Sequence, residues 1–275
     1  MSFQDLRVGF VGGGAMAEAL LGGLLAAGHA PARLRAADPD PARRKRLEEL
    51  GVPVGAENAE VVRASDLVVL AVKPGIVGRA LADVVSALTP AECLRPCYVS
   101  IAAGVPLAAL GRSLPEGARI VRAMPNTPAL VRAGATAYCA NAAATPTDRA
   151  AARALFETVG SAWEAPSEGL LDAVTGLSGS GPAYVFVFLE ALGDAGVRVG
   201  LPREAAYQLA FQTVLGAAKL ALESGRHPAS LKDQVTSPGG TTIAGLERLE
   251  ARGFRAAVYE AVAAATARSR ELGTA

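Results

Sequence analysis

The stretch that decides the fold is LRVGFVGGGAMA, residues 6–17. Its first half is largely apolar and predicts a buried strand, and its second half is a G-x-G-x-x-A turn that opens an Ala- and Leu-rich helix. Gly12 permits the tight turn, and Gly14 lets the backbone approach a pyrophosphate. A glycine triplet can also form an ordinary loop. Because this one follows a strand and begins a helix, it predicts a dinucleotide site made by Gly12, Gly14, Ala15 and Met16.

Short apolar runs and amphipathic stretches alternate through the first half of the chain. Residues 67–72 are continuously apolar, which is typical of a strand buried on both faces of a parallel sheet. A charged helix is expected over residues 41–51. This alternation, with a nucleotide-binding turn at its start, predicts an α/β fold with a doubly wound, Rossmann-type sheet. The other expected strands are residues 34–37, 98–102, 120–123 and 136–140.

The pattern changes near Pro166, after which helical stretches dominate. We therefore expect a dinucleotide-binding domain over residues 1–165 and an all-α domain over residues 166–275. The apolar faces of these helices would be exposed in an isolated chain, so the second domain is predicted to be a dimerisation domain. Its expected helices are residues 184–195, 203–224 and 242–275.

The charge balance excludes several classes of partner. Lys and Arg number 27 against 26 Asp and Glu, a formal net charge of +1, so neither a nucleic-acid surface nor a polybasic membrane patch is expected. No long apolar run and no signal-peptide pattern are present, and a cytoplasmic location is expected.

Few residues are available for metal or thiol chemistry. The three cysteines contain no CxxC pair, and we expect them to be small buried side chains in a reducing compartment. The only histidines are His29 and His227, so neither a metal site nor a histidine general base is expected.

Asp38 follows the second expected strand, about 20 residues beyond the glycine turn. A carboxylate at this place can accept hydrogen bonds from the adenosine ribose and repels a 2′-phosphate. Asp38 could instead be the N-cap of the next helix. Arg43 and Arg44 could offset the repulsion, or could simply form a solvated helix face with the neighbouring Lys45 and Arg46. The residues therefore leave the choice between NADH and NADPH open.

Three further segments follow expected strands at the edge where ligands bind in such sheets. Ala71, Val72, Lys73 and Pro74 end the apolar strand, and this lysine is better explained by cofactor or substrate contact than by solubility. Two small or turn-forming loops, at residues 100–104 and 124–128, can line a nicotinamide pocket.

The segment TSPGGTTI, residues 236–243, lies in the helical half and leads directly into a helix. Two glycines followed by two threonines at a helix N-terminus can form an amide nest suited to a carboxylate. In the alternative interpretation, the Ser and Thr side chains merely cap the first amides of the helix. The pattern alone does not decide between them.

Together these stretches resemble the pyrroline-5-carboxylate reductase family over essentially the whole chain. The most specific segments are DAVTGLSGSGPAYVF (172–186) and LKDQVTSPGGTTIAGLERLEARGFRAAV (231–258). The resemblance is also carried by GFVGGGAMAEAL, LAVKPG, VSIAAGV and RAMPNTPALV.

The resemblance implies an active site at a dimer interface and dimers that often assemble into decamers. By matching position, Ser237, Gly239, Gly240 and Thr241 would hold the substrate carboxylate, and Thr242 would be the catalytic residue that hydrogen-bonds the ring nitrogen. The resemblance also places Asn58, Lys73, Ala103 and Asn126 near the cofactor. Asp38 departs from the residues that the family often uses beside a 2′-phosphate, which bears on the usual NADPH preference.

The implied reaction is hydride transfer from NADPH or NADH to 1-pyrroline-5-carboxylate, which gives L-proline. Alternatives are another imine or 2-hydroxyacid reductase of the same architecture, for which Lys219 or Lys232 would be the candidate proton donor, or a non-catalytic dinucleotide-sensing module.

Overall fold

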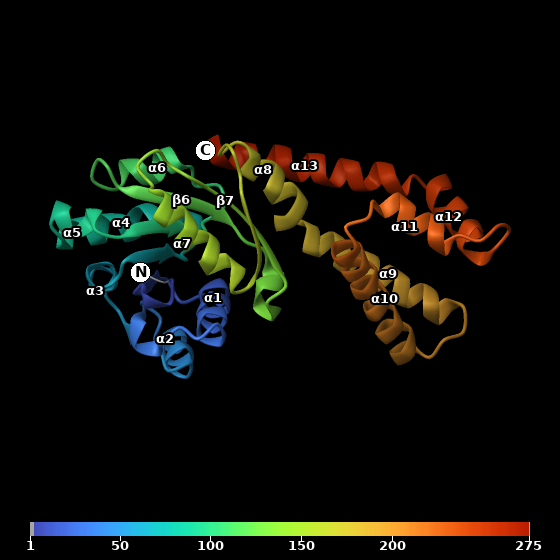
Figure 1. The fold of residues 1–275 in the computed structure, drawn as a ribbon, viewed down its shortest axis with the longest axis horizontal. Helices are drawn as coiled ribbons and strands as arrows, with labels where there is room; N and C mark the ends of the chain where they lie inside the picture. Colours follow the sequence, from blue (N-terminus) through green and yellow to red (C-terminus); the bar gives the residue numbers. More distant parts are fainter. Residues whose placement is uncertain (1–2, 275) are drawn as a thin grey trace. The chain divides into compact units, whose positions relative to one another are not determined.

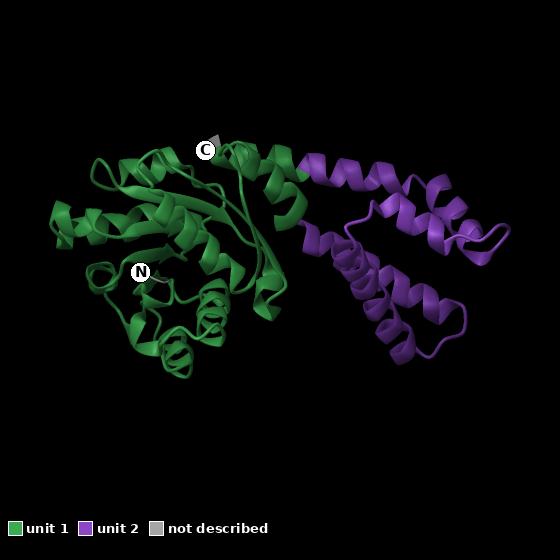
Figure 2. Cartoon of the chain, in the orientation of Figure 1, with its two compact units in different colours: residues 1–179, 265–275 green, residues 180–264 purple. Residues whose placement is uncertain are grey.

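The computed structural model describes residues 3–274, which fall into two compact units (Figures 1 and 2). The first unit reaches Gly179 and also includes the end of the chain from Ala265. The second unit is Ser180–Ala264. The chain therefore leaves the first unit once and returns to it within its last helix, α13 (Phe254–Thr274).

An eight-stranded sheet forms the centre of the first unit, in the order β3-β2-β1-β4-β5-β6-β7-β8. The strands from β3 to β6 are parallel, whereas β7 runs antiparallel to β6 and β8 runs parallel to β7. The strand order reverses between β1 and β4, which makes the ends of these two strands the topological switch point. The strands are β1 Val8–Val11, β2 Leu34–Ala37, β3 Val54–Gly55, β4 Leu67–Leu70, β5 Cys97–Ser100, β6 Arg119–Met124, β7 Gly134–Ala140 and β8 Gly160–Glu164.

Helices cover both faces of this sheet, as expected for a doubly wound fold. Alternate residues of the central strands enter two separate cores: Val8 and Phe10 pack on one side, and Val11 packs on the other. The first core includes α1, α2 and α7, and the second includes α3 to α6. The helices are α1 Ala15–Ala26, α2 Pro41–Glu48, α3 Asn58–Ala64, α4 Pro74–Ala87, α5 Pro90–Leu94, α6 Leu107–Arg112, α7 Pro146–Glu157 and α8 Leu170–Val174.

The predicted α/β fold and all five predicted strands beyond β1 are confirmed, with ends that shift by up to two residues. Two strands were not predicted. β3 is two residues long, and β8 is composed mostly of small or exposed residues and therefore lacks an apolar run. Both are recognisable as strands only through their hydrogen bonds to β2 and β7.

The second unit is entirely helical between its turns. The helix predicted over residues 203–224 is α10 (Arg203–Ser224), and the one predicted over residues 184–195 is the longer α9 (Gly181–Arg198). The prediction of one helix from residue 242 to the end is wrong. The chain forms α12 (Thr241–Ala251) and α13 as separate helices, because Gly253 adopts a φ of 69° that ends the helical path. A further helix, α11, spans Pro228–Val235.

The second unit has almost no core of its own. Its buried residues are Gly193, Ala206 and Ala210, while large apolar side chains on α9 and α10 are exposed. Phe186, for example, is 63% exposed and Leu215 is 62% exposed. Large apolar side chains that gather on exposed helices are typical of a surface that another protein covers.

The compact units do not coincide with the domain boundary predicted between residues 165 and 166. Residues 166–179 and the end of α13 pack with the sheet domain. One contact that holds them there is a hydrogen bond from Ser269 Oγ of α13 to Asp172 Oδ1 of α8, at 2.7 Å. The predicted boundary separates the part expected to bind the dinucleotide from the part expected to dimerise and bind substrate. It does not describe how the chain packs, and it stays a prediction.

Substitution of Tyr98 by Phe tests the core beneath α5. The buried Tyr98 hydroxyl donates a hydrogen bond to the Cys93 carbonyl at 2.9 Å, so its loss is expected to lower the free energy of unfolding by about 1 kcal/mol. Tyr138→Phe is the matched control and should cost less, because the Tyr138 hydroxyl is 3.4 Å from Glu164. Urea unfolding at equal protein concentration measures both, and an equal loss in the two variants would contradict the interpretation.

Candidate active site

The turn after β1 can be made only by glycine at its first position. Gly12 has a φ of 100°, and its amide donates to the Ala37 carbonyl at 2.8 Å. A Cβ at this position would lie 2.7 Å from the Ala71 carbonyl oxygen and 2.8 Å from Val72 Cγ1. The backbones that follow β1 and β4 are thus in close contact at the switch point, which brings the predicted cofactor residues Gly12, Ala71 and Val72 together.

The N-terminus of α1 is open. Its N-cap is Gly14, which provides no side-chain cap, and Ala15 and Met16 are the first residues of the helix. A Cβ built on Gly14 meets no protein atom within 4 Å. Uncapped amides beside free space at a helix N-terminus suit the pyrophosphate of a dinucleotide.

A hollow of about 450 Å³ lies beside this turn. It brings together Gly12, Asn58 at the start of α3, and Val72 after β4. Arg79 and Ile76 of α4 also line it, and no sequence motif had pointed to either residue. The hollow has the place and size for the adenosine half of the cofactor.

Asp38 is buried and clamps the turn. Its Oδ2 accepts a hydrogen bond from the Gly13 amide and its Oδ1 accepts one from the Asp40 amide, both at 2.8 Å. The alternative in which Asp38 is the N-cap of α2 is wrong. Asp40 is the N-cap, and its side chain accepts from the Ala42 amide.

The basic run on α2 is partly engaged with this acidic turn. Arg43 Nη1 lies 3.5 Å from Asp38 Oδ2, and Arg44 Nη1 donates to the carbonyls of Asp38 and Pro39 at 2.9 Å. Arg46 instead pairs with Glu18 of α1 at 3.0 Å. Two guanidinium groups therefore lie next to the only buried carboxylate of this turn.

The remaining predicted cofactor residues follow β4, β5 and β6 at the same edge of the sheet. Lys73 is exposed and is the N-cap of α4, whose first residue is Pro74. Ala103 is exposed in the loop before α6. Asn126 differs from these, because it is buried and both ends of its side-chain amide bond to the protein: Nδ2 donates to the Ser178 carbonyl and Oδ1 accepts from the Ala135 amide.

In the second unit, the predicted substrate loop forms a second open helix N-terminus. Gly239 has a φ of 66°, and a Cβ on Gly240 would overlap Ser237 Oγ. Gly240 is the N-cap of α12 and has no side-chain cap, and Thr241 and Thr242 are the first two helical residues. The alternative in which Ser or Thr side chains cap this helix is therefore not what the structure shows.

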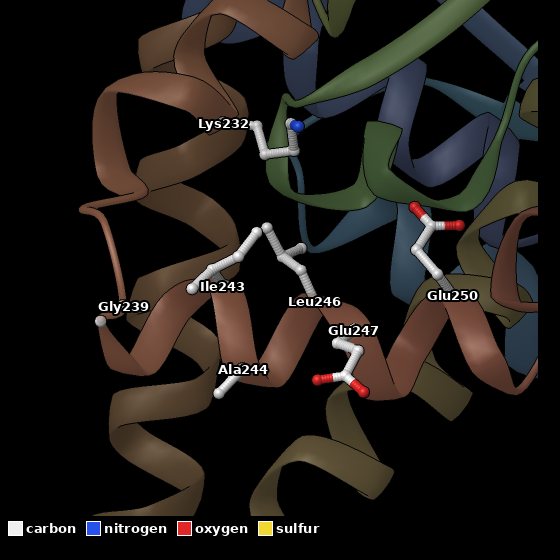
Figure 3. Close-up of a pocket in the computed structure, with 8 residues that line it drawn as sticks. Lys232, Gly239, Ile243, Ala244, Leu246, Glu247 and Glu250 are labelled. Atoms are coloured by element: carbon white, nitrogen blue, oxygen red, sulfur yellow. The ribbon is translucent and has the colours of Figure 1, made fainter.

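A hollow of about 470 Å³ adjoins this loop (Figure 3). Gly239 and Gly240 line it together with Lys232 of α11, a residue that the resemblance did not assign to the substrate site. In Figure 3, Ile243 and Leu246 point to the side of α12 on which Lys232 lies. Lys232 Nζ also pairs with Asp233 at 2.9 Å. The hollow thus combines apolar walls, a helix N-terminus, the Lys232 ammonium and the carboxylates of Glu247 and Glu250.

The cysteines are placed as structural side chains. All three are buried, and burial raises the pKa of Cys97 to about 12 and that of Cys139 to about 11. Such thiols are not nucleophiles at neutral pH. Among residues 3–274, no cluster of three His, Cys, Asp or Glu side chains could hold a metal ion, and no helix is long and apolar enough to cross a membrane.

Two parts of the chain match models of known protein families. Residues 168–272 match the family model for pyrroline-5-carboxylate reductase dimerisation, and residues 7–104 match that for NADP oxidoreductase, coenzyme F420-dependent. A pyrroline-5-carboxylate reductase of Synechocystis is 50% identical over 272 residues, which cover 98% of this chain and 99% of the relative. This chain belongs to the pyrroline-5-carboxylate reductase family.

Solved structures of the family have the same fold. The pyrroline-5-carboxylate reductase of Coxiella burnetii is 37% identical, with a TM-score of 0.91 over 97% of this chain and 98% of that one. The enzyme of Plasmodium falciparum, solved with NADP bound, is 33% identical, with a TM-score of 0.85 over 99% of this chain and all of that one. The helical region is therefore a dimerisation domain, which agrees with its exposed apolar faces.

Two glycine substitutions separate the structural role of the turn from its role in binding. Gly14→Ala is expected to leave the unfolding free energy within about 1 kcal/mol but to weaken dinucleotide binding at least about tenfold, because its Cβ enters the space reserved for phosphate. Gly12→Ala should lower both the free energy of unfolding and the affinity for the dinucleotide, since its Cβ meets the Ala71 carbonyl. Calorimetric titration with NADPH and urea unfolding measure the two effects. Unchanged binding in Gly14→Ala would contradict the phosphate assignment.

Proposed function

We propose that this chain reduces 1-pyrroline-5-carboxylate to L-proline, with NADPH or NADH as the hydride donor. The observation that carries the proposal is the pair of uncapped helix N-termini, at Gly14 and at Gly240, in a chain that matches pyrroline-5-carboxylate reductases over its whole length. One suits the cofactor pyrophosphate and the other suits the substrate carboxylate.

The cofactor would be held by the turn and the strand ends of the first unit. The amides at Gly14, Ala15 and Met16 would bind the pyrophosphate, and the hollow beside Asn58 and Val72 would take the adenosine. When bound, the nicotinamide supplies a hydride from C4. Lys73, Pro74 and Ala103 follow strands at the edge where this ring would lie.

The substrate would be held by the N-terminus of α12. The amides of Gly239 and Thr241 would bind the carboxylate. The Gly240 amide donates to the Ser237 carbonyl at 3.1 Å, and this bond fixes the shape of the turn. Thr242 would hydrogen-bond the ring nitrogen and so orient the imine. A protonated imine is already electrophilic at carbon, so accepting the hydride at carbon gives the neutral amine of proline without a strong protein acid. The chain then contributes mainly by positioning the imine carbon next to the hydride donor.

The dimer is expected to be the smallest functional form, because the second unit alone leaves its apolar faces exposed. Assembly of dimers into decamers remains a prediction of the family resemblance, and a cytoplasmic location remains a prediction of the sequence pattern.

The activity is tested by following the loss of NADPH or NADH absorbance with pyrroline-5-carboxylate as substrate. Turnover with proline as product is expected. A folded dimer that binds dinucleotide without turnover would favour a sensing module, and turnover only with other imines or 2-oxoacids would favour a different reductase of the same architecture.

Replacement of Thr242 tests the substrate assignment. Thr242→Ala is expected to lower kcat/KM about 10- to 100-fold, or ~1.4–2.7 kcal/mol, because the ring nitrogen loses its partner. Thr242→Ser keeps the hydroxyl and should retain most of the activity. Lys219→Ala is a control in the same unit, since Lys219 is exposed and pairs with Glu223 at 3.7 Å. Wild-type kinetics in Thr242→Ala would remove this residue from the mechanism, and loss of turnover in Lys219→Ala would favour hydroxyacid reductase chemistry.

Asp38 is expected to set the cofactor preference. In Asp38→Ser the carboxylate that repels a 2′-phosphate is gone while Arg43 and Arg44 remain, so the ratio of kcat/KM for NADPH to that for NADH should rise at least about tenfold. Asp40→Ser is the matched control, because serine still caps α2 and the ratio should not change. An equal change in both variants would show that general charge, rather than Asp38, governs the preference.

A further inference from the structure

An irregular helical segment lies where the chain leaves the first unit, before Ser180. After α8 the chain forms a π-helical turn, Thr175–Gly179, and then enters α9 of the second unit. π-Turns are rare and concentrate at functional sites. The turn is made within TGLSG, part of the stretch that most specifically resembles the family, and none of its residues has been given a role above.

The π-turn is fastened to the end of β6 by Asn126. The Asn126 Nδ2 donates to the Ser178 carbonyl at 3.0 Å, and its Oδ1 accepts from the Ala135 amide at 2.9 Å. Packing is close at the same place, since a Cβ on Gly179 would lie 2.8 Å from Met124 Cε. Asn126 is 9% exposed, and each end of its side-chain amide bonds to the protein, so the side chain holds the loop after β6 in place.

The residues before α8 are fastened to the loop after β5. Glu168 Oε1 accepts from the Leu107 amide and from Arg122 Nη1, each at 2.7 Å. Leu107 is the first residue of α6, so the carboxylate satisfies a free amide of that helix directly after the loop that contains Ala103. Arg122 is 8% exposed, and an unpaired guanidinium at this depth would be costly.

The end of α13 reaches the same loop. Ser269, which is 6% exposed, donates to Asp172 of α8, and a Cβ on Gly104 would contact the backbone of Leu272 at 3.9 Å. Residues 168–179 are thus bonded to the loops after β5 and β6 and to α13, all within the first unit.

We propose that residues 168–179 form a brace that sets the position of the nicotinamide-side loops, and that Asn126 and Glu168 are its positioning residues. The proposal rests on the proposed function, because the loops after β5 and β6 are assigned to the nicotinamide there. A misplacement of the hydride donor by about 1 Å can slow the reaction about 100-fold, so a loosened loop slows the reaction before it weakens binding. The adenosine and pyrophosphate, held at the other strand ends, keep the cofactor bound.

Two substitutions of Asn126 distinguish the brace from simple packing. Asn126→Ala removes both bonds, whereas Asn126→Asp keeps an acceptor for Ala135 and loses the donor to Ser178. Both variants are expected to lower kcat at least about tenfold, with the Kd for NADPH within about threefold of the wild type. Recovery of wild-type kcat in Asn126→Asp would overturn the proposal, because the bond to Ala135 alone would then suffice.

Asn141 provides a matched control at the opposite edge of the sheet. Its Nδ2 donates to the Ala118 carbonyl, and its Oδ1 accepts from the Ile120 and Ala144 amides. Asn141→Ala therefore removes the same kind of bridge far from the strand ends that bind the cofactor, and kcat should stay within about twofold of the wild type. An equal fall in kcat for Asn141→Ala and Asn126→Ala would overturn the proposal.

Glu168 gives a second route if the Asn126 variants do not fold. Glu168→Ala should show the same fall in kcat with little change in NADPH binding, and Glu168→Gln, which keeps an acceptor for the Leu107 amide, should lie closer to the wild type. Amide hydrogen exchange of the NADPH-bound enzyme gives a readout without the substrate. Faster exchange in residues 101–107 of Glu168→Ala, but not of Glu168→Gln, is expected. Unchanged exchange there would overturn the brace even if the wild-type enzyme proved inactive on pyrroline-5-carboxylate.

Discussion

The structure depends on one close approach, between the backbones that follow β1 and β4. Gly12 leaves β1 with a φ of 100°, and the Ala71 carbonyl occupies the space where a Cβ would be. Because β1 and β4 are neighbours at the point where strand order reverses, this approach determines where a ligand can lie. It also fixes the direction of α1, whose uncapped N-terminus opens on that point.

Buried polar side chains then hold the loops around the switch point in place. Asp38 uses both carboxylate oxygens to fix the glycine turn and the approach to α2, and Asn126 uses both ends of its amide to fix the loop after β6, at the same edge of the sheet. Each of these groups is buried and bonded to the protein at both ends of its side chain, so each fixes the geometry of a loop. The site is therefore a set of open helix ends and strand ends whose positions are determined by residues that need not touch a ligand.

The second unit, unlike the first, buries few residues of its own. Three small buried residues, Gly193, Ala206 and Ala210, cannot support a helical unit of this length, and its large apolar side chains remain exposed. Small residues at the crossing of α9 and α10 allow close approach: a Cβ on Gly193 would lie 2.9 Å from the ring of Tyr207. The exposed apolar side chains agree with the match of this region to a dimerisation domain.

The sequence by itself determined the doubly wound fold, the nucleotide turn and the helical second half, because periodicity and glycine spacing are local properties of the chain. It also located α10 to the residue and predicted the helix N-terminus at Ala15 as a phosphate site, but it left open whether Ser or Thr side chains cap the helix that begins at Thr241. Only the tertiary structure showed β3 and β8, whose pairing partners define them, and the break before α13 at Gly253. It alone decided that Asp40 rather than Asp38 caps α2, that Asn126 bonds to Ser178, and that Glu168 meets Leu107. These contacts join residues up to 61 positions apart, and no local pattern encodes a partner at that distance.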